Sequence, residues 1–229
     1  MDNFQVIFYS LLGAAAILFW HHMTRTYTDF RNRAIVHRND WNFNGVYGDD
    51  IRTSLKEKYL FFNNLRNVMQ LDFIEGYFQF RHFKLFEIMH SFGTNLLAVE
   101  IENLDKTRTM EIVSKNLPNV LLKHFRTNLI KGELDYAVFN DEFDFFKTNR
   151  EDQYYMLSPD MMEALLDLKS TIGAFGLEAN NRNIFVFCAY PPYLEYLKKS
   201  KNTYDTDGKE KEKIYKDFIA QIVQIDNKI

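Results

Sequence analysis

Histidine and cysteine are the residue types in this chain that are best suited to metal binding and nucleophilic catalysis. The six histidines stand at positions 21, 22, 37, 82, 90 and 124, and no two of them share with a carboxylate the helical spacing of a zinc protease. His21 and His22 are adjacent, and adjacent helix positions point about 100° apart, so they are a poor joint ligand for one metal ion. The single cysteine, Cys188, lies in the apolar run IFVFCAY without an evident base, and we expect a small buried side chain. The sequence therefore predicts no metal site and no thiol nucleophile.

Carboxylates could supply acid–base chemistry at two places. Asp49 and Asp50 follow a glycine, but their spacing does not match a calcium loop, and a role in capping a helix from Ile51 explains them better. Residues 141–144, Asp-Glu-Phe-Asp, lie on a predicted turn and strand, and nothing in the sequence shows that they enclose a cleft. Nucleophile-elbow, phosphate-loop and dinucleotide fingerprints are absent from the sequence. We therefore assign no catalytic, cofactor-binding or metal-binding residue.

Composition excludes one class of partner and predicts a packed core. The chain of 229 residues has a net charge of −3, whereas binding to nucleic acid phosphates requires a basic face. Apolar residues make up 46% of the sequence, which is normal for a globular protein. We therefore expect a folded domain that does not bind nucleic acid.

The N-terminal segment is the most apolar part of the chain. Phe4–Trp20 reads FQVIFYSLLGAAAILFW, and no charged residue occurs between Asp2 and Arg25. As a helix this run covers about 25 Å, against about 30 Å of hydrocarbon in a bilayer. Aromatic residues at both ends are typical of a membrane span. We predict a membrane anchor over residues 1–24 with its span at 4–20; a signal peptide, which would need a basic start, and a buried core helix are the alternatives.

The charges that follow this segment predict its orientation. Residues 21–38 contain one acid, Asp29, and four arginines, Arg25, Arg31, Arg33 and Arg38. The N-terminal flank has no lysine or arginine. Because the basic flank of a span stays in the cytoplasm, the N-terminus is expected outside and the rest of the chain inside. These arginines either touch anionic headgroups or belong to a solvated linker helix.

The remaining sequence predicts an α+β fold, in which the N-terminal transmembrane helix is followed by a mostly antiparallel sheet with packed helices. We divide it into a basic juxtamembrane segment and helix (25–70), an α+β domain (71–197), and a charged loop with a C-terminal amphipathic helix (198–229). Ser158-Pro159 predicts the start of a helix and Gly173 its end. A further helix is expected at 51–69. Residues 116–126 are ambiguous, and a short helix opened by Pro118 is one interpretation of them. Strands are predicted at 71–79, 83–90, 96–100, 107–113, 134–139, 142–147, 175–179 and 184–190, the last two as a hairpin.

The final helix carries an apolar stripe at helical spacing. Its members are Ile214, Phe218, Ile222 and Ile225. The stripe either packs on the sheet or forms a docking face for a partner protein, and these four residues are our partner-binding candidates.

Several motifs follow one another along most of the chain. After the apolar segment come Asp40-Trp41-Asn42-Phe43, the glycine-centred strand pair within residues 64–87, FNDEFDF at 139–145, LSPDMM at 157–162, and a hairpin with Asn-x-Ile. In this order they resemble an uncharacterised family of bacterial membrane-anchored proteins, whose first motif tends to read Gly-Trp-x-aromatic. Asp40 stands here in place of that glycine. The resemblance implies an α+β domain on the cytoplasmic side of a bacterial membrane and carries over no catalytic residue.

Together these features predict a membrane-anchored binding or scaffold module that faces the cytoplasm, in the bacterial cell membrane with its N-terminus outside. Its partners would be the lipid bilayer, through residues 4–20, and a protein. The alternative is an enzyme whose site is assembled from residues distant in sequence. Self-association through small residues of the anchor stays open, and the candidates are Ser10, Gly13, Ala14 and Ala16.

Overall fold

The computed structural model describes residues 3–44, 49–59, 61–62, 68–90, 95–102, 110–118, 130–147, 157–180, 183–199, 205 and 207–226. Within these residues the strands form one sheet in the order β1-β2-β3-β4-β9-β8-β5-β7-β6, with antiparallel neighbours throughout. The strands are β1 (Asn42–Asn44), β2 (Val68–Phe78), β3 (Arg81–His90), β4 (Asn95–Glu102), β5 (Met110–Ser114), β6 (Ile130–Gly132), β7 (Phe143–Lys147), β8 (Phe175–Asn180) and β9 (Asn183–Cys188). The helices are α1 (Asn3–Asn39), α2 (Asp49–Lys58), α5 (Ala137–Glu142), α7 (Pro159–Ile172), α8 (Pro191–Lys199) and α9 (Lys209–Asp226). The predicted α+β class with an antiparallel sheet is confirmed.

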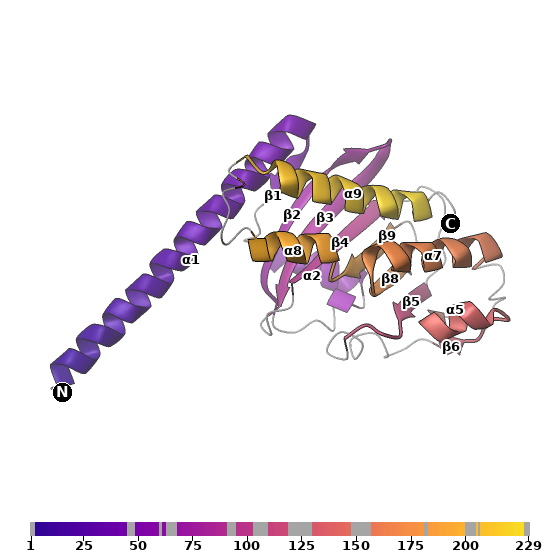
Figure 1. The fold of residues 1–229 in the computed structure, drawn as a ribbon, viewed down its shortest axis with the longest axis horizontal. Helices are drawn as coiled ribbons and strands as arrows, with labels where there is room; N and C mark the ends of the chain where they lie inside the picture. Colours follow the sequence, from indigo (N-terminus) through magenta and orange to yellow (C-terminus); the bar gives the residue numbers. More distant parts are fainter. Residues whose placement is uncertain are drawn as a thin grey trace.

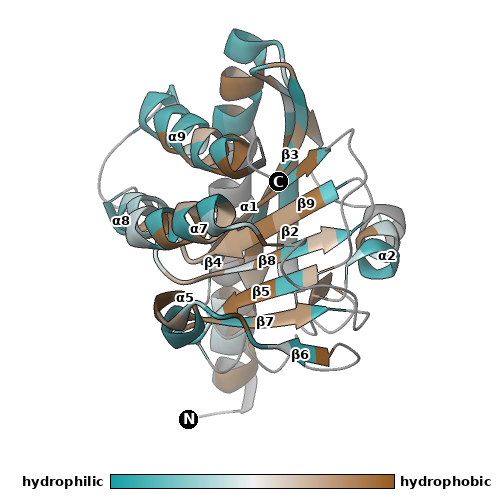
Figure 2. Ribbon diagram, turned by 90° about the vertical axis from the view of Figure 1, so that its right-hand side faces the viewer, coloured by the Kyte–Doolittle hydropathy of each residue, from teal (hydrophilic) through white to brown (hydrophobic). Residues whose placement is uncertain are grey.

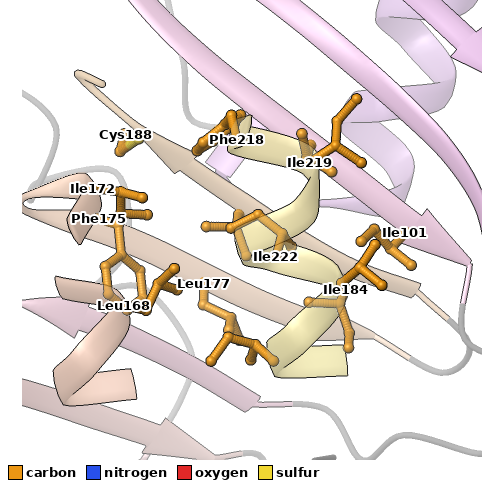
Figure 3. Close-up of a cluster of buried hydrophobic side chains, with 14 of the residues drawn as sticks. Ile101, Leu168, Ile172, Phe175, Leu177, Ile184, Cys188, Phe218, Ile219 and Ile222 are labelled. Carbon is orange, nitrogen blue, oxygen red and sulfur yellow. The ribbon is translucent and has the colours of Figure 1, made fainter. Parts of the chain in front are cut away.

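Helices cover both faces of this sheet. In Figure 2, α5, α7, α8 and α9 lie on one side of the strands and α2 on the other. Figure 3 shows Leu168 of α7 and Ile222 of α9 packed toward Leu177 and Ile184 of the strands below them. Because the central strands are buried on both faces, their sequences read as continuous apolar runs rather than alternating patterns.

The β8–β9 hairpin lies between β4 and β5 in the sheet. β9 pairs with β4 and β8 pairs with β5, although both strands come much later in the chain. The two halves of the sheet are therefore joined through a late hairpin, and beyond β4 the order of the strands in the sheet differs from their order in the chain.

The start and end predicted for the helix after Ser158 are confirmed. α7 begins after Ser158, whose side chain accepts a hydrogen bond from the Met161 N–H, and Pro159 occupies the first turn. The helix ends at Gly173, which adopts a positive φ of 81°. The hairpin predicted over 175–190 is likewise present as β8 and β9.

Other element boundaries differ from the sequence prediction. α2 starts at Asp49 and stops at Lys58, whereas a helix was expected over 51–69, and residues 68 and 69 already belong to β2. The strand expected over 134–139 is replaced by α5, because a helical turn brings Phe139 into the core, where its ring stacks on Phe143 at 4.8 Å. Pro191 opens α8 instead of only ending the preceding strand. The helix expected at 116–126 lies largely outside the described residues.

The first helix is continuous and projects away from the sheet (Figure 1). The predicted apolar and juxtamembrane segments thus form one helix. No helix among the residues that the structure describes is long and apolar enough to cross a membrane, so the span predicted at residues 4–20 gains no support from the structure.

Candidate functional site

The N-terminal half of α1 exposes apolar side chains on all its sides. Val6, Ile7, Phe8 and Tyr9 are consecutive, which covers a full helical turn, and each is about half exposed or more. Every side chain that the structure describes between Val6 and Phe19 is exposed, so this stretch is not the buried core helix of the alternative interpretation. A helix that is apolar all round normally lies in a protein core or in lipid. The large exposed side chains are Val6, Ile7, Phe8, Tyr9, Leu11, Leu12, Leu18 and Phe19.

The last part of α1, residues 31–39, is in contrast held firmly on the domain. Ile35 is fully buried, and Gly208 at the start of α9 approaches so closely that a Cβ there would lie 3.3 Å from the carbonyl oxygen of Arg31. Arg38 pairs with Glu212 of α9 at 2.6 Å and donates to the carbonyl oxygen of Asp207 at 2.8 Å. Contacts between residues about 170 positions apart in the chain therefore fix the direction in which α1 leaves the domain.

Glu212 is the centre of this α1–α9 contact. Its carboxylate accepts hydrogen bonds from Arg38, Asn39 and Lys216 at 2.7–2.9 Å. Partial burial raises the pKa of Glu212, but these three donors outweigh it and hold the pKa at about 2. The carboxylate is thus ionised at any physiological pH, and the contact does not titrate in that range.

A second group of polar side chains lies between α1, α8, α9 and the sheet. Lys211 is 3% exposed, and its ammonium group lies 2.5 Å from Glu87 Oε1 of β3 and donates to Asn32 Oδ1 of α1 at 2.9 Å. Arg31 of α1 donates to the Tyr196 hydroxyl of α8 at 2.8 Å. A buried charge is costly unless it is paired, so these partners restrict how α1 can pack.

The opposite face of the sheet carries a row of buried glutamates. Glu100 of β4 accepts hydrogen bonds from the Tyr59 hydroxyl at 2.7 Å and from Lys58 at 2.9 Å. Glu178 of β8 accepts one from the Phe61 N–H at 3.2 Å. The rings of Tyr59 and Phe61 stack on the aromatic residues of β9 between these strands. The segment after α2 is therefore fastened across the sheet, which explains why α2 ends at Lys58.

Glu111 of β5 continues this row but, unlike Glu100 and Glu178, its carboxyl group accepts no hydrogen bond from the described residues. It is fully buried, stands directly opposite Glu178, and neither carboxylate oxygen has a hydrogen-bond partner among the described residues. Burial and the neighbouring Glu178 raise the pKa of Glu111 to about 8. Such a carboxyl group can hold a proton at neutral pH, but its complete burial keeps substrates away. No group of three or more metal-ligating side chains suited to a metal ion occurs in the described part of the chain.

The sequence-predicted site residues do not meet at a surface. Ile214, Phe218, Ile222 and Ile225 are 0–8% exposed and belong to the core between α9 and the sheet. This is the packing alternative, and these four residues form no exposed docking face. Of the carboxylates near residue 142, Glu142 pairs with Lys169 and Asp144 with Lys131, both as ion pairs rather than around a cleft.

The buried glutamates were missed, although the sequence contains a signal for them. Glu100, Glu111 and Glu178 each stand alone inside a strand that is otherwise apolar, in AVEIE, MEIV and GLEAN. A charged residue at such a position is expected to be paired or to have a shifted pKa. The signal could have identified the row, but not its alignment across β4, β8 and β5.

The fold and these contacts define an α+β sheet domain that carries a projecting N-terminal helix. Residues 105–227, more than half of the chain, match the family model described as a protein of unknown function (DUF3137), and the chain belongs to this family. No curated protein matches the sequence.

One solved structure is similar in fold. It is the crystal structure of the mycobacterial trehalose monomycolate transport factor A, TtfA, with a TM-score of 0.51 and 9% sequence identity. The match covers 83% of this chain and 93% of that one. At this identity the similarity concerns the fold alone.

Proposed function

We propose that this protein is a membrane-anchored binding or scaffold module, in which the N-terminal half of α1 enters a lipid bilayer and holds the α+β domain beside it. The observation that carries the proposal is that the apolar side chains described between Val6 and Phe19 are exposed on every side of the helix. Removing those large side chains from water is worth on the order of 10 kcal/mol. A lipid bilayer offers that environment to every side of the helix at once, whereas a protein groove covers one side.

The rigid attachment of α1 supports a scaffold role. Because Ile35, Arg38 and Lys211 fix the helix on the domain, a bilayer that holds α1 also sets the orientation of the sheet. A flexible tether would localise the domain without orienting it.

The arginines after the apolar run favour one topology. With Arg25 and Arg33 on the inner side, the N-terminus lies outside and the domain faces the cytoplasm of a bacterial cell. This proposal rests on the charge pattern alone.

Flotation of the full chain with lipid vesicles tests the anchor. The wild-type protein should float, and the double variant Leu11→Asp/Leu12→Asp should partition more than ~100-fold less, because each buried aspartate costs about 3 kcal/mol. The matched control is Ile130→Asp/Val138→Asp, which changes two exposed apolar residues of the domain. A wild-type chain that stays with the soluble fraction, or equal flotation of both variants, would refute the proposal.

Cysteine labelling in intact cells tests the topology. A membrane-impermeant reagent should reach Asn3→Cys and should reach Lys209→Cys only after permeabilisation, while buried Cys188 stays unlabelled. Protection of both positions would place α1 within the inner leaflet instead of across the bilayer. Labelling of position 209 in intact cells would overturn the orientation.

A further inference from the structure

We infer that α1 pairs in parallel with α1 of a second copy of this chain. This inference rests on the proposed anchoring by α1 and adds the partner and the contact surface. The surface is one line of positions at alternating spacings of three and four residues, which we call the heptad stripe: Gly13, Ala16, Trp20, Met23, Tyr27 and Phe30. This spacing is the seven-residue repeat of a helix that packs along another helix.

The part of the heptad stripe that follows the apolar run carries the inference. Within residues 21–31, the apolar and aromatic residues are Met23, Tyr27 and Phe30, and the other eight residues are polar. An apolar run marks no particular face of a helix, but three apolar positions among eight polar ones do. The repeat therefore selects one face of α1 where the surrounding sequence is hydrophilic.

The described part of the domain does not cover this face. Phe30 is 62% exposed, although Arg31 and Asn32, the next two residues, already bond to side chains of α8 and α9. Phe30 lies about 140° around the helix from Ile35, which is fully buried on the domain. In Figure 1 the N-terminal part of α1 lies clear of the other elements. The heptad stripe therefore faces away from the domain, and a pair of α1 helices leaves room for the two domains on opposite sides.

The bilayer does not cover Phe30 either. Phe30 lies about 15 Å along the helix beyond Trp20, where the apolar run ends. The headgroup layer is only about 5–7 Å thick, and even a helix tilt of about 40° leaves Phe30 about 11 Å beyond the hydrocarbon. An exposed aromatic side chain at this height is removed from water only by another protein surface.

A second copy supplies that surface. Two chains anchored with the same topology have parallel α1 helices at the same depth, so each position of the heptad stripe faces its own equivalent. Gly13 and Ala16 are exposed and small, which lets the two helices approach closely inside the bilayer. A repeat of seven drifts by about 20° per heptad on a straight helix, and a left-handed supercoil of two helices compensates for this drift. A different protein would need its own parallel helix with a matching stripe at this height.

Disulfide cross-linking of the purified full chain in phosphatidylcholine vesicles tests the pairing. Tyr27→Cys and Phe30→Cys should form cross-linked dimers roughly ten-fold faster than Arg25→Cys and Thr28→Cys, because a disulfide needs Cα atoms within about 7 Å and the latter two positions lie on other faces. Buried Cys188 is present in every variant, and the wild type gives the background rate. Equal rates at the four positions, or rates no faster than the wild type, would overturn the inference and assign the heptad stripe to another occupant.

Two neighbouring alanines of the apolar run provide a matched pair of variants in the Phe30→Cys background. Ala16→Leu adds bulk on the heptad stripe and should slow the cross-linking several-fold, whereas Ala15→Leu adds the same bulk on another face and should leave the rate unchanged. Both keep an apolar helix and should float with vesicles as the wild type does. Equal rates in the two variants would overturn the continuous stripe. A chain that floats without selective cross-linking refutes the pairing alone, whereas a chain that does not float refutes the anchor.

Discussion

The indole ring of Trp41 lies directly on Gly76, so closely that a Cβ at residue 76 would be 2.3 Å from Cδ1 of the indole. The indole nitrogen donates to the carbonyl oxygen of Tyr77 at 3.3 Å, and the ring meets Phe83 edge-on at 5.0 Å. Trp41 follows α1 by two residues. The contact therefore joins the end of the projecting helix to the β2–β3 hairpin.

Replacing Gly76 by alanine should destabilise the domain by about 1–3 kcal/mol, because the indole has to leave its site on β2. The measurement is the free energy of unfolding in mild detergent. Gly13→Ala is the matched control, since the added methyl group meets nothing within 4 Å in the described residues beyond the nearby backbone of its own helix, and alanine is the better helix former. A Gly76→Ala variant as stable as wild type would show that Trp41 is not held in this position.

Asp40 occupies a position that suits glycine. It has a positive φ of 55° directly after α1, and the Trp41 N–H donates to the Val36 carbonyl oxygen at 3.0 Å, as in a Schellman helix end. Asp40→Gly should raise the free energy of unfolding by roughly 0.5–1 kcal/mol, because a side chain is strained in this conformation.

Asp40→Ala is the informative counterpart. Alanine removes the carboxylate but keeps the Cβ, so it should be no more stable than wild type, whereas glycine should be more stable. If alanine and glycine stabilise equally, the charge of Asp40 and not its backbone conformation is the cause.

Local chemistry in the sequence predicted the elements whose ends are set by neighbouring residues. Ser158, Pro159 and Gly173 define α7 by hydrogen bonding and backbone preference, and both act within a few residues. The family motif with glycine before Trp41 also predicted the position of positive φ correctly, although aspartate occupies it in this chain. Such signals need no knowledge of the rest of the fold.

Tertiary contacts decided the elements that the sequence did not predict. α2 stops at Lys58 because Tyr59 and Phe61 stack on Phe185 and Phe187 of β9, more than 120 residues later. The stripe from Ile214 to Ile225 has the same pattern whether it meets a sheet or a partner, and only the fold shows that it meets the sheet. Likewise, the pairing of Glu111 with Glu178 depends on which strands become neighbours.

Glu212→Gln should loosen the base of α1. The amide keeps the shape of the side chain but loses the ion pair with Arg38, so amide hydrogen exchange at residues 31–39 should speed up several-fold. Because the folded pKa of about 2 lies below the unfolded value of 4.5, the carboxylate stabilises the contact above about pH 4.5, and this stabilisation is lost as pH falls through about 2.

The pH dependence separates this effect from a general loss of stability. In the wild type, exchange at residues 31–39 should accelerate below about pH 4.5 relative to that in the central strands, and Glu212→Gln should show no such step. Glu163→Gln, on the exposed face of α7, is the control and should behave as wild type. An acid step that persists in Glu212→Gln would assign it to another group.

Glu111→Gln should make the domain more stable at alkaline pH. The folded pKa of about 8 exceeds the unfolded value of 4.5, so the folded state binds the proton more tightly, and the free energy of unfolding falls as pH rises between these values and is flat above. The full span corresponds to at most about 5 kcal/mol, and Glu178 shares part of it. Glutamine is neutral at every pH, so the variant should match wild type near pH 5 and exceed it by a few kcal/mol near pH 9, measured by chemical denaturation. Glu163→Gln should keep the wild-type slope, and a slope that survives in Glu111→Gln would mean that another buried group binds the proton.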